Sequence, residues 1–195
     1  SPHHVEEQLE SVEWTTIIFF AGLFIMIHGL EYMGLINAIA EGISDTISQA
    51  DESNRLMVAV LLLLWVSAIA SAFIDNIPYT ATMVPVVIEL ASNPELGLAL
   101  GPLAWALALG ACLGGNGTII GASANVVAAG LAEEAGYDIS FNRFFKTGFP
   151  IMILSVTLAT AYCVVRYAIK WSNDFIPMAI IATMMVASLS LTPVI

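Results

Sequence analysis

The stretch SAFIDNIPYTATMVP, residues 71–85, carries the side chains best suited to chemistry in a strongly apolar part of this chain. An acid at Asp75 is followed by an amide at Asn76 and by Pro78, between two apolar runs. An ionisable side chain inside a membrane segment is unfavourable by about 2.5 kcal/mol or more, so by default it indicates function. Asp75 could bind a cation, exchange a proton or cap the helix that follows.

A second polar interruption lies within LGACLGGNGTIIGASANVVAAGLAEEAGY, residues 109–137. The apolar segments on either side of GGNGT, 114–118, are each too short to cross a bilayer, which needs about 20 helical residues. Glycine permits backbone conformations that other residues avoid, so GGNGT predicts a helix broken into two halves. In this interpretation Asn116 caps the second half, and Thr118 lies in its first turn.

Both motifs have a structural alternative. The first could be a polar turn that joins two ordinary spans in the headgroup region. The second could be a continuous glycine-rich helix that packs closely on its neighbours through Gly117, Gly121 and Ala122. A re-entrant hairpin and a broken helix are favoured, because irregular backbone at membrane depth is tolerated where it lines a polar cavity. Their ends would offer carbonyl groups to a cation and N–H groups to an anion.

Composition places these motifs in a membrane protein. Hydrophobic residues make up 58% of the 195 residues and charged residues 11%, with a mean hydropathy of +0.87. These values lie outside the range of soluble domains, and the length permits about four to six membrane segments. A net charge of −11 with only 5 Lys and Arg argues against a nucleic-acid partner.

The expected elements follow from the apolar runs and from the helical spacing of Ile36, Ile39, Ala40, Ile43 and Ile47. The second helix of the hairpin is expected to begin beyond Pro78. The opening residues lack a signal-peptide pattern, so we expect an internal piece of a longer protein. The elements are an acidic flank over 1–13, a span over 14–35, an interfacial helix over 36–50, a hairpin over 55–91, a broken helix over 102–132, a span over 144–168 and a further apolar, truncated segment over 172–195.

The two motifs, followed by GYDISFNRFFKTGFPIM, closely resemble the C-terminal half of the melanosomal P-protein family and its prokaryotic relatives. That family is similar to citrate transporters, arsenite-efflux permeases, D-type sodium/proton antiporters and divalent anion/sodium symporters of the ion transporter superfamily. The resemblance covers roughly residues 14–171. It implies an all-α elevator-type membrane protein of two inverted repeats, each with a re-entrant hairpin and a discontinuous helix, of which this chain supplies one.

The resemblance also implies where the site lies. The symporters carry Ser-Asn-Thr at the hairpin tip, where this chain has Asp75, Asn76 and Ile77. This departure puts carboxylate substrates in doubt and favours a cation or a proton. Carried over residue by residue, the ion and substrate ligands are Asp75, Asn76, Thr80, Asn116, Gly117, Thr118 and Asn125, with Na+ at Asp75, Asn76 and Gly117. From their residue types, we expect structural roles for Pro78, Gly114, Gly115 and Gly121.

The function expected from these features is secondary active transport of a small inorganic or organic anion, coupled to H+ or Na+ and without another cofactor. The resemblance implies an N-terminal repeat, a second copy in a homodimer and the lipid bilayer as partners. It also implies a plasma membrane, or an organelle membrane of melanosome-like or endolysosomal type.

Two other functions compete with transport. A passive anion (chloride) channel of the same fold would need the same polar layer. An intramembrane enzyme is disfavoured, because membrane aspartyl proteases need two apposed aspartates and Asp75 is the only Asp within an apolar segment.

The carboxylate at Asp75 can be tested by its charge. Asp75→Asn keeps the shape and hydrogen bonding of the side chain, so the protein should fold, while ion coupling should fail because the negative charge is lost. The measurement is Na+- and H+-dependent flux by the full-length protein in liposomes. Unchanged coupling and pH dependence would show that Asp75 only caps a helix.

Overall fold

The structure is a computed structural model that describes residues 18, 21–22, 25–26, 28–29 and 32–168. The segments expected over 1–13 and 172–195 lie outside the described residues, as does much of the span expected over 14–35. The described part consists of helices and turns without a strand, in agreement with the all-α expectation.

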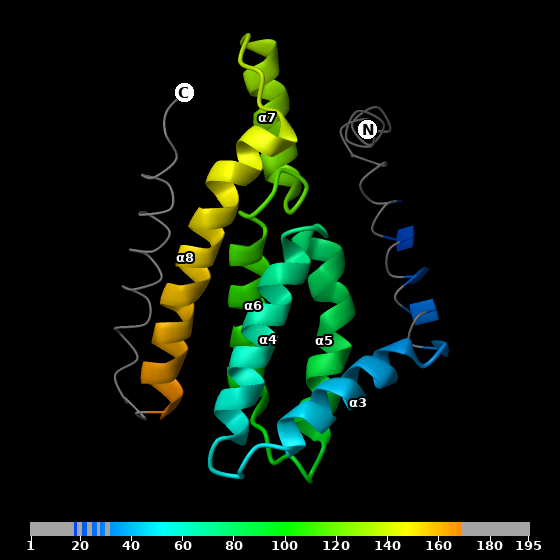
Figure 1. The fold of residues 1–195 in the computed structure, drawn as a ribbon. Helices are drawn as coiled ribbons and strands as arrows, with labels where there is room; N and C mark the ends of the chain where they lie inside the picture. Colours follow the sequence, from blue (N-terminus) through cyan, green and yellow to red (C-terminus); the bar gives the residue numbers. More distant parts are fainter. Residues whose placement is uncertain (1–17, 19–20, 23–24, 27, 30–31, 169–195) are drawn as a thin grey trace, which may run out of the picture.

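Helices α4, Arg55–Ser71, and α5, Asn76–Ser92, form a hairpin with a tight turn at its tip (Figure 1). The expectation that the second helix begins beyond Pro78 is wrong, because α5 begins at Asn76. Pro78 lies in the first turn, where its missing N–H removes no hydrogen bond from the helix. Asp75 precedes this turn as the N-cap residue.

The helix around GGNGT is broken, as the glycines predict. Helix α6, Leu100–Gly114, ends at the first of these glycines, and α7, Ser123–Glu134, begins only after Ala122. The expected positions of Asn116 as a cap and of Thr118 in the first turn of the second half are therefore wrong. The break is longer than expected because Thr118 bonds to the hairpin tip instead of joining α7.

Helix α3, Leu35–Ser48, crosses the open end of the hairpin and packs on α5 and α4 (Figure 1). Its residues Ile36, Ala40 and Ile47 are buried, and Ile43 is partly buried against the same core. The amphipathic face expected from the spacing is thus confirmed. Its placement in a membrane interface stays a prediction.

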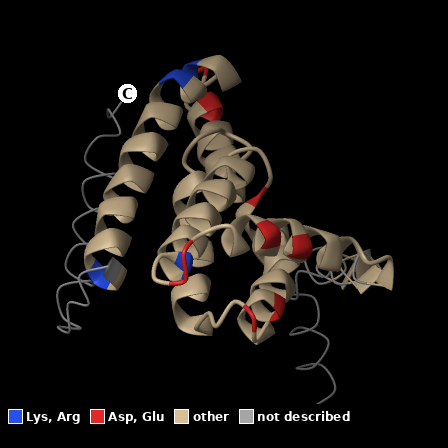
Figure 2. Cartoon of the chain, turned by 60° about the horizontal axis from the view of Figure 1, so that its bottom comes forward, with Lys and Arg blue, Asp and Glu red and all other residues tan. Residues whose placement is uncertain are grey.

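Helix α8, Phe141–Ala168, has 28 residues and is about 42 Å long. It is the one helix in the described part that is long and apolar enough to cross a membrane, over Phe141–Tyr167. The charged residues of the fold lie mainly near helix ends and in loops (Figure 2). With 17 and 15 residues, α4 and α6 are about 25 Å and 22 Å long, short of a hydrocarbon core of about 30 Å. Such lengths fit helices that stop at depth.

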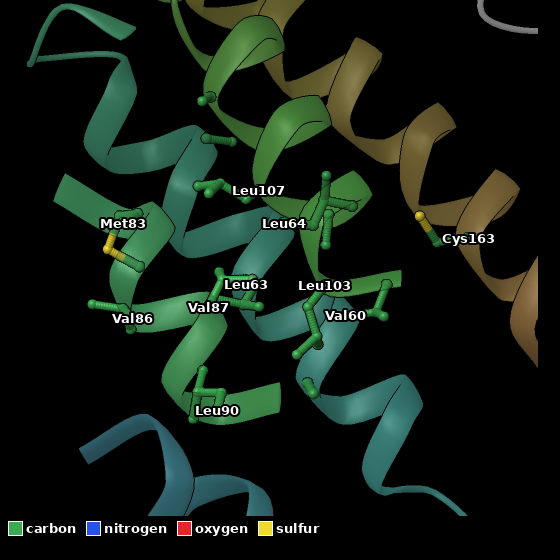
Figure 3. Packing of buried hydrophobic residues seen from close by; sticks show 14 of the residues in the cluster. Val60, Leu63, Leu64, Met83, Val86, Val87, Leu90, Leu103, Leu107 and Cys163 are labelled. Carbon is green, nitrogen blue, oxygen red and sulfur yellow. The ribbon is translucent and has the colours of Figure 1, made fainter. Parts of the chain in front are cut away.

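The core is centred on α4, which packs against α5, α6 and α8 (Figure 3). The buried cluster consists mainly of aliphatic side chains, with three sulfur-containing ones at Met83, Met152 and Cys163. The labelled members of the cluster are Val60, Leu63, Leu64, Met83, Val86, Val87, Leu90, Leu103, Leu107 and Cys163.

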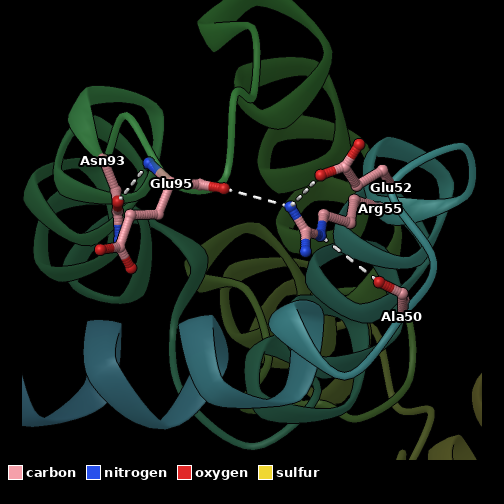
Figure 4. A network of polar contacts seen from close by, with 5 residues as sticks. All are labelled: Ala50, Glu52, Arg55, Asn93 and Glu95. Atoms are coloured by element: carbon pink, nitrogen blue, oxygen red, sulfur yellow. Dashed lines mark hydrogen bonds and ion pairs between the residues drawn. The ribbon is translucent and has the colours of Figure 1, made fainter.

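Arg55 closes the open end of the hairpin (Figure 4). Its Nη1 donates to the carbonyl of Glu95 at 3.1 Å, and its Nε donates to the carbonyl of Ala50 at 3.4 Å. An ion pair with Glu52 spans 3.9 Å, but the Glu52 side chain is 89% exposed, so this pair contributes little. The two carbonyl bonds hold together the loops before α4 and after α5.

Two glycines bring the backbones of α4 and α6 into contact. A Cβ added at Gly110 would lie 2.5 Å from the carbonyl oxygen of Leu64, and one added at Gly114 would overlap the carbonyl of Ala68. Only glycine allows this approach, because the obstacle is backbone rather than a movable side chain.

Gly114→Ala should therefore force α4 and α6 apart and lower the free energy of unfolding by about 1–3 kcal/mol. Gly42→Ala in α3 is the matched control, since a Cβ there meets nothing within 4 Å. Thermal unfolding in detergent compares the two variants. Equal melting temperatures would contradict the backbone contact.

Candidate functional site

The hairpin tip and the break loop, residues 115–122, are joined by Thr118. Its side chain is fully buried, and its Oγ1 donates a short hydrogen bond to the carbonyl of Ala72. The same oxygen accepts from the N–H of Gly121 at 3.1 Å. One hydroxyl therefore satisfies groups from both motifs, and the two interruptions seen in the sequence form one structural unit.

Three carbonyl oxygens converge beside Gly121. A Cβ added there would lie 2.9 Å from the carbonyl oxygens of Ser71, Ala72 and Gly115. These oxygens belong to the C-terminal ends of α4 and α6, where carbonyl groups lack partners within the helix. We call this set the carbonyl cradle. Among the described residues, the Ser71 carbonyl accepts no hydrogen bond.

Asn125 folds back from the first turn of α7 onto the break loop. Its Nδ2 donates to the carbonyl of Gly115 at 2.8 Å and to the carbonyl of Thr118 at 3.0 Å. Both amide hydrogens are thereby used within the loop. The geometry fixes which end of the amide faces the loop, since an oxygen there would confront two carbonyl oxygens.

Three buried hydroxyl groups near the tip were missed by sequence reasoning. The hydroxyl of Tyr79 donates to Ser67 Oγ at 3.1 Å, and Ser71 Oγ donates to the carbonyl of Ala111 at 2.7 Å. The available signal was the helical spacing of Ser67 and Ser71, which places both on the same face of an otherwise apolar helix. Their hydroxyls supply the polar lining between α4, α5 and α6.

The three predicted site residues of the hairpin, Asp75, Asn76 and Thr80, lie at its tip. The carboxylate of Asp75 is half-buried and accepts from the N–H of Ile77 at 3.0 Å, so it caps α5. Asn76 and Thr80 lie on the first turns of α5. In the described part of the chain, no hydrogen bond joins these three side chains to the break loop.

The other predicted residues of the break loop act through their backbones. Gly117 N–H donates to the carbonyl of Gly114 at 2.8 Å, and a Cβ at Gly117 would lie 3.0 Å from the Cβ of Ala72. The side chain of Asn116 makes no hydrogen bond with the described residues. No group of three or more His, Cys, Asp or Glu side chains among the described residues could hold a metal ion.

The junction packs against α8 near one end of its apolar stretch. Gly148 packs so closely on the loop that its Cβ would lie 2.6 Å from the carbonyl oxygen of Asn116. Along the helix, Gly148 is about 3 Å from Lys146 and about 27 Å from Arg166. The polar junction therefore lies beside the Lys146 end of the apolar stretch of α8.

A pocket of about 320 Å³ lies elsewhere, between α3 and the C-terminal end of α5. Its lining includes Glu41, Ser44 and Glu89, and it shares no residue with the hairpin tip or the break loop. The hydrogen-bonded junction is the better candidate site, because it unites the two motifs found in the sequence.

Removing the Thr118 hydroxyl should weaken this junction. Thr118→Val leaves the buried carbonyl of Ala72 without its donor, while the N–H of Gly121 keeps a 3.3 Å bond to the carbonyl of Thr118. It should lower the free energy of unfolding by about 1–3 kcal/mol, whereas Thr118→Ser should keep the unaltered stability. Thr157→Val is the control, since that exposed hydroxyl bonds only to the carbonyl of Ile153 in its own helix. Thermal unfolding of the three variants in detergent is the measurement, and an equal effect of both valines would contradict this role.

Comparison with known proteins agrees with the resemblance seen in the motifs. A model of the citrate transporter family matches residues 1–110. The P protein of Homo sapiens is 50% identical over 171 residues, which cover 88% of this chain and 20% of that protein. The 46 kDa membrane protein of Mycobacterium leprae is 43% identical over 163 residues, 84% of this chain and 37% of that protein.

An uncharacterized transporter of Mycobacterium tuberculosis is 45% identical over 161 residues, 83% of this chain and 36% of that protein. The chain thus spans a fifth to about a third of the length of these relatives. No solved structure matches it significantly. The family match covers more than half of the chain, and relatives over most of its length are named as transporters. The chain is a membrane protein that belongs to the citrate transporter family.

Proposed function

We propose that this segment forms one cation-binding half-site of a secondary active transporter, which couples the movement of a small inorganic or organic anion to Na+. The carbonyl cradle beside Gly121 is the observation that carries the proposal. The N-terminal repeat of the same transporter and a second copy would complete the assembly.

Cation binding follows from the direction of two helices. The C-terminal ends of α4 and α6 meet at the cradle, so their dipoles place partial negative charge at one point. Backbone carbonyl oxygens can replace the hydration shell of a monovalent cation inside a membrane. Carbonyl groups do not take up protons near neutral pH, so the cradle favours Na+ over H+.

Anion binding follows from the helix that begins at the same loop. Helix α7 has no side-chain cap at Ala122, and the N–H groups of Ser123 and Ala124 donate to no acceptor among the described residues. Free N–H groups at a helix N-terminus attract anions. The substrate is therefore proposed to bind at the start of α7, close to the cradle.

A passive anion channel is the second candidate. The observation that favours it is the capping bond of Asp75, since a carboxylate already engaged by Ile77 N–H has less need of a coupling ion. The start of α7 would then attract an anion without a cation.

Gly121→Ala tests the proposal directly, because the added methyl group would occupy the space between the three carbonyl oxygens. In liposomes containing the full-length protein, the Na+ concentration for half-maximal anion uptake should rise by about tenfold or more, equivalent to about 1.4 kcal/mol. Gly130→Ala in α7 is the control, since a Cβ there meets nothing within 4 Å.

Two outcomes would contradict coupled transport. Anion uptake by the unaltered protein without any dependence on Na+ or H+ gradients would refute it. A current that reverses at the equilibrium potential of the anion would identify the channel instead. Size-exclusion chromatography of Gly121→Ala must show folded protein before its uptake is interpreted.

A further inference from the structure

Helix α7 differs from the other described helices in that it packs against none of them. None of its residues is buried. Figure 1 shows it extending beyond the ends of α4 and α5. Its apolar residues Val126, Val127 and Leu131 are 51%, 62% and 62% exposed. Side-chain packing within the described part therefore does not fix the position of α7.

Asn125 provides a polar link between α7 and the site. Its two hydrogen bonds run to the carbonyls of Gly115 and Thr118, on the far side of the extended residue Ala122. Among the side chains of α7, no other makes a hydrogen bond to the described residues. The link is side chain to backbone, so it depends on one amide group.

Asn125 is connected to two of the three oxygens of the carbonyl cradle, one directly and one through Thr118. The carbonyl of Gly115 is itself one of them. The carbonyl of Ala72 is another, and it is held by Thr118, the second residue that Asn125 binds. A displacement of Asn125 would therefore change the position of oxygens from both α4 and α6.

We propose that Asn125 is a positioning residue that couples the position of α7 to the geometry of the carbonyl cradle, and that it is not itself a ligand of the ion. This inference rests on the proposed function. Both hydrogens of the amide are used by the loop, so the side chain orders the carbonyl groups while they face the ion. An anion bound at the start of α7 would shift that helix and with it Asn125, which bonds to the loop. Binding of the substrate would thereby affect binding of the cation.

Asn125→Asp separates this role from direct ligation. The carboxylate has the same shape but cannot donate, so it would repel the carbonyls of Gly115 and Thr118 and weaken binding of radiolabelled Na+ by about tenfold or more. At acid pH the protonated carboxyl can donate one hydrogen bond, so Na+ binding should partly recover relative to the unaltered protein. A direct ligand predicts the opposite sign, with tighter binding at neutral pH and weaker binding in acid.

Two controls accompany this variant. Asn142→Asp places the same charge change on an exposed residue of α8 whose side chain makes no hydrogen bond with the described residues, and it should bind Na+ as the unaltered protein does. It also reports any effect of pH on Na+ binding that does not depend on position 125. Asn125→Ala should weaken binding at every pH, without recovery in acid.

A measurement that needs neither Na+ nor transport keeps the inference separate from the proposed function. The measurement uses a spin label on the cysteine of Val127→Cys in α7, in full-length protein whose exposed Cys112 is replaced by serine. The label should become more mobile in Asn125→Asp and Asn125→Ala but not in Asn142→Asp. If the unaltered protein binds no Na+ while the label responds in this way, the proposed function fails and the link between α7 and the loop stands.

Three results would overturn the inference. One is equal label mobility in the unaltered protein and in Asn125→Ala. Another is Na+ binding by Asn125→Asp that is as strong as in the unaltered protein at neutral pH. The third is binding by Asn125→Asp that tightens at neutral pH and weakens in acid, which would make Asn125 a ligand.

Discussion

The close approach of α4 and α6 is the constraint on which the rest of the structure depends. Gly110 and Gly114 lack the side chains that would keep the α6 backbone away from the carbonyls of Leu64 and Ala68. Since apolar burial does not drive association within lipid, such contact and its polar links hold helices together there. Both helices then end at the same depth, and the hairpin tip meets the break loop.

That shared ending explains the polar junction. Helix ends leave carbonyl groups unpaired, and a membrane offers no water to satisfy them. Thr118 and Asn125 satisfy some of these groups, whereas the Ser71 carbonyl stays without a partner in the described part. The same geometry that completes the fold therefore brings three carbonyl oxygens together around Gly121.

The role of single residues depended on neighbours that are distant in the chain. Thr118 and Ala72 are far apart in sequence, yet their bond joins the break loop to the hairpin tip. Asp75 attracts attention as an acid in an apolar region, and in the structure it caps α5. Ser67 and Tyr79 do not stand out in the sequence, because single hydroxyl groups are common in apolar helices. In the structure their hydroxyl groups form a buried hydrogen bond.

The sequence by itself determined the membrane class, the family, the amphipathic face of α3, and the breaks at the hairpin tip and at GGNGT. These features depend on local composition, on periodicity and on the conformational freedom of glycine. Only the tertiary structure decided that the break extends to Ala122, that Gly121 faces three carbonyl oxygens, and that Asn125 bonds to the loop. Those features arise from contacts between segments distant in the chain, and no local pattern specifies which carbonyl meets which donor.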